Sequence, residues 1–145
     1  MASFNKYQIF VEDLTNKVHD LFGTAGSGAD TCKVMLSNTA PNAATHAVRA
    51  DVTELGAGNG YSSGGTTATN VGTRSTGTYT MAGTDIVFTA SGGTIGPFRY
   101  AILYNDTPTS PADPLIGWWD YGSAITLNDT ETFTVDFGAS IFTLV

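Results

Sequence analysis

The sequence is poor in cysteine, histidine and basic residues. Its 145 residues include one cysteine, two histidines and six lysines and arginines, against thirteen aspartates and glutamates. The single cysteine, Cys32, excludes an intramolecular disulfide and a cysteine-rich metal site. A net charge of −7, with its few basic residues scattered along the chain, offers no basic patch for phosphates. We therefore expect no nucleic-acid partner and no membrane partner.

Long hydrophobic runs are also missing. No apolar stretch approaches the ~20 residues that a membrane-spanning helix needs, and the N-terminal residues MASFNKYQIF lack the apolar centre of a secretory signal. These absences predict a soluble product made in the cytoplasm. Cys32 precedes the apolar run Val34-Met-Leu36 in a strand-like segment, which predicts a small buried side chain rather than a reactive thiol.

Recognisable catalytic motifs are absent as well. The two histidines, His19 and His46, stand in no metal-ligand spacing, and no serine lies in a GxSxG motif. The glycine-rich residues 56–65 lack the lysine and the third glycine of a phosphate-binding loop. We therefore expect no catalytic residue and no cofactor. The alternative from the enzyme class is a small β-fold hydrolase that uses two carboxylates in a deep pocket.

Carboxylates are numerous, and three of them flank one loop. Asp106, Asp113 and Asp120 could approach one another around a calcium ion, but the glycine and closing glutamate of an EF-hand loop are missing. Turn capping and solubility explain these aspartates more simply, so we expect no bound metal.

Short alternating strands fill residues 66–145. Apolar residues alternate with polar ones in 85–90 and 133–137, and alternating aromatic and aliphatic residues fill 98–104. Asn128-Asp129 predicts a hairpin between 125–127 and 131–137. This spacing predicts a single all-β domain over residues 1–145, an antiparallel β-sandwich of jelly-roll-like or barrel form.

The N-terminal half is less regular. Apolar residues in 4–15 follow helical spacing, although 7–11 is also strand-like, so residues 1–16 are interpreted as an N-terminal arm or a short helix. Strands are expected at 18–21 and 31–36, with a flexible turn at 23–28. Residues 56–65 are too rich in glycine for a strand and predict a long surface loop.

The segment PLIGWWDYG, residues 114–122, holds both tryptophans of the chain. In an extended strand, Leu115, Trp119 and Tyr121 would share one face and point into the core. Trp118 would lie beside Asp120 on the opposite face, where it could contact a neighbouring chain. The alternative is that both rings are buried between two sheets.

Several segments together resemble a family of short virion proteins of tailed bacteriophages, and within it capsid decoration (cement) proteins. The resemblance spans nearly the whole chain and is carried by these segments: 10–14, 18–21, 33–36, 39–41, 58–61, 87–93, 95–100, 103–106 and 114–122. It implies a β-rich, non-enzymatic protein on the outer surface of the capsid, bound to the major capsid protein. It also implies a homo-oligomer, expected to be a trimer.

Aromatic and neighbouring side chains are the candidate interface residues under this resemblance. They are Trp118, Tyr121, Asp120, Tyr61, Phe4, Tyr7 and Phe10. The alternative function is a tail or head-fibre component that binds a carbohydrate or receptor, with Trp118, Tyr121 or Tyr61 stacking on sugar rings.

Overall fold

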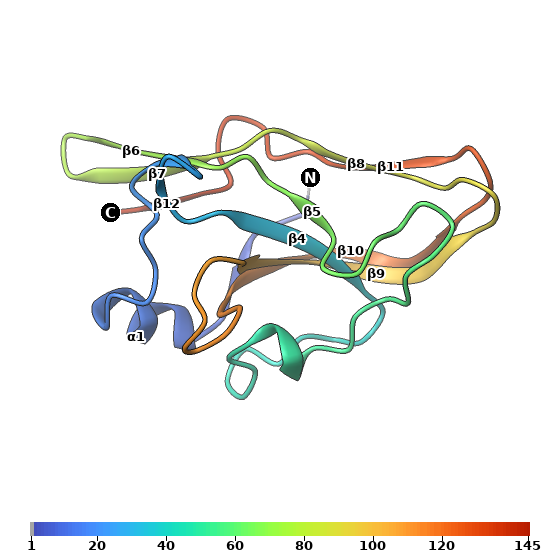
Figure 1. Ribbon diagram of the computed structural model, residues 1–145, viewed down its shortest axis with the longest axis horizontal. Coiled ribbons are helices and arrows are strands. Elements are labelled where there is room, and N and C mark those ends of the chain that lie inside the picture. The colour runs from blue at the N-terminus through green and yellow to red at the C-terminus, as the bar shows by residue number, and fades with distance from the viewer. Residues whose placement is uncertain (1) are drawn as a thin grey trace.

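The chain folds into two packed layers of β-sheet (Figure 1). The structure is a computed structural model and describes residues 2–145. The first layer is a five-stranded sheet in the order β1, β10, β9, β4, β5. Its strands are β1 (Asn5–Lys6), β10 (Leu115–Leu127), β9 (Ile95–Asn105), β4 (Cys32–Ser37) and β5 (Thr66–Thr67).

The second layer contains two smaller ladders. One has the order β12 (Phe142–Leu144), β7 (Thr78–Ala82), β6 (Val71–Ser75), β2 (Gly23–Ala25), β3 (Gly28–Ala29), and the other pairs β11 (Thr132–Val135) with β8 (Ile86–Thr89). The chain runs directly from β7 to β8 and from β11 to β12, so the ladders lie end to end in one layer (Figure 1). Among residues 2–145 the strand pairs are antiparallel, except that β2 pairs with β3 in parallel. The predicted all-β sandwich is confirmed, and the sheets do not close into a barrel.

The main core lies between the two layers. Strand alternation places Ile86 and Phe88 of β8 in it, while Val87 on the opposite face is 53% exposed. This agrees with the half-buried strand expected at 85–90. Cys32 is fully buried in the same core, as predicted for a small apolar side chain.

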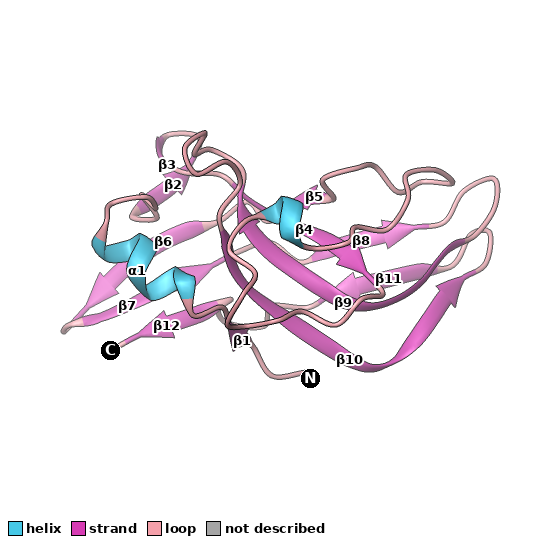
Figure 2. Cartoon of the chain, turned by 90° about the horizontal axis from the view of Figure 1, so that it is seen from below, coloured by secondary structure: helices cyan, strands magenta, loops and turns pink. Residues whose placement is uncertain are grey.

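Strand β9 is buried on both of its faces. Ala101 and Leu103 point into the core between the layers, whereas Ile102 and Tyr104 belong to a second apolar cluster on the outer face of the first layer. This second cluster also contains Tyr7, Met35, Val52, Tyr100 and Leu115. The segment that leads into the short helix α1 (Ile9–Thr15), and the loop around the short helix η1 (Arg49–Asp51), cover this face. Helix α1 itself lies at the end of the molecule formed by β6, β7 and β12 (Figure 2), where Phe10 joins the main core. No helix among residues 2–145 has the length and apolar character needed to cross a bilayer.

Some local predictions for the N-terminal half are wrong. The helix begins only at Ile9, because the preceding residues 5–6 pair with β10 as β1. Residues 18–21 form no strand, since Val18 N–H bonds back to Asp13 O and Leu21 O accepts the Tyr79 hydroxyl. The expected flexible turn at 23–28 instead contains β2 and the start of β3.

The expected hairpin around Asn128-Asp129 is also wrong. A turn is present, with Glu131 N–H bonded to Asn128 O. However, β10 pairs with β9 and β11 pairs with β8, so the turn carries the chain from one layer to the other. Each flanking segment already has a partner strand in its own layer.

Candidate functional site

The two tryptophans lie on opposite faces of β10, as strand alternation predicted. Trp118 packs against Tyr7 on the outer face, with ring centroids 4.7 Å apart. Trp119 faces the interior, 5.3 Å from the Phe4 ring and 5.6 Å from the Phe137 ring. Both indoles are half-buried, so Trp118 is covered by the chain's own N-terminal segment more than we expected.

The expected grouping of Leu115 with Trp119 is wrong. Leu115 pairs with Tyr104 of β9 and Gly117 pairs with Leu103. Strand β10 therefore has one extra residue, Ile116, between two consecutive pairs of the ladder. Such a bulge reverses the sense of alternation. Leu115 therefore joins Trp118 in the outer cluster, and Ile116 joins Trp119 in the interior.

Tyr121 is on the surface, which corrects the expectation of a core position. Asp120 pairs with Tyr100 and Ile125 with Phe98, so residues 121–124 bulge out of the ladder. Gly122 has φ +99°, a conformation that favours glycine. The Tyr121 side chain is 56% exposed, and its ring meets the edge of Phe133 at 5.8 Å.

An open groove lies between this part of β10 and strand β11. It has a volume of about 320 Å³ and is lined by the following residues: Ala2, Arg99, Ala101, Trp119, Tyr121, Phe133, Thr134, Val135 and Asp136. A second hollow shares Ala2, Trp119 and Asp136 with the groove. The two layers are therefore not fully closed along this side of the sandwich.

Charges at the groove are unevenly paired. Arg99 donates two hydrogen bonds to the Asp120 carboxylate, at 2.7 and 2.9 Å, and this lowers the pKa of Asp120. Asp136 accepts only the Gly138 N–H, at 2.7 Å, and no cation lies within ion-pair distance of it in the described part of the chain. The groove therefore combines aromatic walls with one uncompensated carboxylate.

Three of the candidate interface residues are buried, so the prediction that they lie at the surface is wrong. Tyr7 and Phe10 are fully buried and Tyr61 is 3% exposed. Tyr7, just before α1, packs against Trp118 on the outer face of the first layer, whereas Phe10 in α1 enters the core between the layers and meets Phe142 of β12. Phe4 is half-buried against Trp119 and Phe142.

Tyr61 is held inside by the half-buried carboxylate of Glu54. Its hydroxyl accepts the Leu36 N–H at 3.0 Å and donates to Glu54 at 2.8 Å. Glu54 also accepts from Arg49 and from Gly64 N–H. Burial raises the pKa of Glu54, but these hydrogen bonds outweigh it and the pKa is lowered. This cluster fixes the glycine-rich loop to the first layer.

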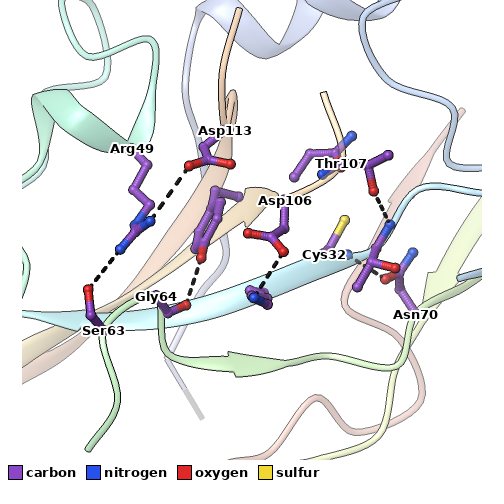
Figure 3. A network of polar contacts seen from close by, with 12 residues as sticks. Cys32, Arg49, Ser63, Gly64, Asn70, Asp106, Thr107 and Asp113 are labelled. Carbon is purple, nitrogen blue, oxygen red and sulfur yellow. Dashed lines mark hydrogen bonds and ion pairs between the residues drawn. The ribbon is translucent and has the colours of Figure 1, made fainter. Parts of the chain in front are cut away.

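The three aspartates considered for calcium each pair with a different cation. Asp106 lies 2.9 Å from Lys33, Asp113 lies 3.6 Å from Arg49, and Asp120 pairs with Arg99. Figure 3 shows Arg49 between Asp113 and Ser63, and Asp106 reaching the lysine on β4. Among residues 2–145 no group of three or more His, Cys, Asp or Glu side chains is arranged to hold a metal ion.

His19 is buried beneath α1 and is not the strand residue expected. Its Nδ1 lies 3.1 Å from the Asn105 amide nitrogen, which also donates to Asp30 at 2.6 Å. Burial lowers the pKa of His19 to about 4. These partners lie far from His19 in sequence or beyond a turn, so no local pattern could have revealed them.

The fold defines the class as an all-β sandwich with one open side. Comparison with protein-family models, curated proteins and solved structures gives no significant match.

Proposed function

We propose that this protein is a capsid decoration protein that binds the outer surface of a tailed-phage shell and stabilises it. The observation that carries the proposal is the open aromatic groove between β10 and β11, in a domain whose other large aromatic clusters are packed internally. The resemblance of segments such as 87–93 and 114–122 to phage virion proteins supplies the context. The proposed role is binding, with no chemical step.

Rigid attachment of loops suits a protein that bridges shell subunits under load. Outside the groove the first layer is covered on both faces, and Glu54 and Arg49 tie the loops of its outer face to the sheet. Such packing leaves few ways for the domain to deform. The net charge of −7 supports a position facing solvent and shell rather than packaged DNA.

Tyr121 is the side chain through which we propose the shell is contacted. Aromatic residues are enriched at protein interfaces, and the energy of binding is concentrated in a few of them. Tyr121 is 56% exposed beside the half-buried Trp119 and Phe133, so a partner could cover all three rings together.

The test is rebinding of the purified protein to empty, expanded capsids that lack it. We expect the protein to sediment with the capsids and to raise their thermal unfolding temperature. Tyr121→Ala should weaken binding, whereas Phe22→Ala should not, because Phe22 is equally prominent, at 61% exposed, but does not line the groove. Capsids that neither bind the protein nor gain stability would contradict the proposal.

Carbohydrate binding is the second candidate, favoured by the placement of Tyr121 beside the charged pair Arg99 and Asp120. Sugar sites commonly combine an aromatic face with planar polar groups. Glycan binding by the isolated protein that is lost in Tyr121→Ala, with no binding to capsids, would favour this alternative. Sedimentation of the free protein tests the expected trimer separately.

A further inference from the structure

Strand β11 has a free edge that faces the groove. In the described chain β11 pairs with β8 alone. Glu131 O accepts the Ala90 N–H, so the odd-numbered residues of β11, Phe133 and Val135, direct their main-chain groups toward β8. Thr132 and Thr134 therefore direct their N–H and C=O groups to the free edge, and Thr134 itself lines the groove.

The opposite wall of the groove is sheet face without a covering strand. Arg99 and Ala101 of β9 and Trp119 and Tyr121 of β10 contribute this wall. In a complete sandwich each strand of one layer faces a strand of the other, about 10 Å away. In the part of the chain that the structure describes, the second layer has no strand beside β11 at the position that faces β10.

From this geometry we infer that the groove receives an extended segment of the shell subunit, which adds a strand to the free edge of β11 and covers Trp119 and Tyr121. The inference rests on the proposed function for the identity of the partner. Strand addition explains why an aromatic wall and an unpaired main-chain edge occur in one place: main-chain hydrogen bonds provide affinity, and alternate side chains enter the apolar wall.

Charge specifies the inserted segment further. Arg99 is neutralised by Asp120, whereas Asp136 has no cationic partner among residues 2–145. Asp136 lies in the groove just beyond the end of β11. The inserted strand should therefore alternate apolar residues, directed toward Trp119, with at least one lysine or arginine that reaches Asp136.

A matched pair of variants at one position tests the inference. Thr134→Pro removes the N–H that an added strand would use, and proline is tolerated at a free strand edge. Thr134→Val keeps the N–H and the shape of the side chain. We expect Thr134→Pro to bind empty capsids at least about tenfold more weakly than Thr134→Val, because one main-chain hydrogen bond is lost and the proline ring obstructs the strand that would pair there.

Hydrogen exchange of the wild-type protein gives a second readout that does not depend on a folded variant. Binding to capsids should slow amide exchange at Thr132 and Thr134, as measured by mass spectrometry with residue-level fragmentation. Equal binding of the two variants, or unchanged exchange at these amides in the bound protein, would overturn strand addition while leaving capsid binding intact.

Other outcomes are equally decisive. A wild-type protein that fails to bind capsids removes the proposed function and, with it, the proposed partner. If Thr134→Pro instead dissociates an oligomer of the free protein, the occupant is a second copy of this chain and the inference is wrong. Glycan binding that depends on Tyr121 but is unaffected by Thr134→Pro would also overturn it.

Discussion

At the scale of single residues, Asp13 of α1 and His19, which follows the helix, face each other with one unsatisfied polar atom each. Nε2 of His19 lies 4.0 Å from Oδ2 of Asp13, and neither atom has a hydrogen-bond partner within the described chain. Burial lowers the pKa of His19 to about 4 and raises the pKa of Asp13. Each group is thus held away from its charged form, and stability should depend on pH.

The direction of this pH dependence is set by His19. Unfolded His19 takes up its proton near pH 6.5, well above the folded pKa of about 4, so stability is complete above 6.5 and falls as pH decreases toward 4. We expect a loss of about 2 kcal/mol between pH 7 and pH 5. Asp13 acts in the opposite direction, because its folded pKa is raised, over the range just above 3.8.

Urea unfolding of the wild type and of His19→Gln, each at pH 7 and pH 5, measures this dependence. His19→Gln should remove most of the loss, since glutamine does not titrate. The nearby carboxylate Asp30 is retained in both proteins and serves as an internal control. An equal loss in both proteins would assign the pH dependence to other groups.

At the scale of elements, β1 closes one end of the open side of the sandwich. Asn5 pairs with Trp118 and Lys6 with Gly117, and the Phe4 ring lies on Trp119. Gly117 has no room for a side chain, because a Cβ there would collide with the Phe4 ring and with Asn5 O. The glycine is required for close approach of the two strands.

Gly117→Ala should therefore displace β1 and lower the free energy of unfolding by about 1–3 kcal/mol. Limited proteolysis should cut the N-terminal residues faster than in the wild type. Ser123→Ala, at an exposed position of the same strand, is the control and should change neither measurement. Unchanged proteolysis in Gly117→Ala would show that the neighbouring ring adapts without loss of β1.

Local patterns predicted the strands but not their neighbours. The alternation around Ile86 and Phe88 is a property of the segment itself, so their burial could be predicted from sequence. The bulge after Leu115 is a shift of register against the facing strand β9, and a local pattern does not show which residues of two strands pair. Tyr121 was predicted as an interface residue, but Thr134 was not, because a free edge is defined only by which strands pair.

At the scale of the whole molecule, two apolar clusters share the first layer. Trp119 reports on the core between the layers and Trp118 on the outer cluster. Strand β9 contributes to both clusters, so neither can come apart without disturbing the other. We expect one cooperative unfolding transition, as is usual for a domain of this size.

Two single-tryptophan variants test this expectation. Trp118→Phe leaves a fluorophore in the inner core, and Trp119→Phe leaves one in the outer cluster. In each variant the fluorescence midpoint in urea should coincide with the midpoint from far-ultraviolet circular dichroism. A fluorescence change that precedes the circular dichroism in Trp119→Phe would instead show that the outer cover detaches first.

The burial of Cys32 has a kinetic consequence. Its side chain is fully enclosed at the start of β4, its N–H bonds to Asn70 at 2.8 Å, and burial raises the pKa of its thiol. A thiol reagent can reach it only while β4 is detached from its neighbours. Cys32 is the only cysteine in the sequence, so the rate at which the protein is alkylated measures opening of the first layer around β4.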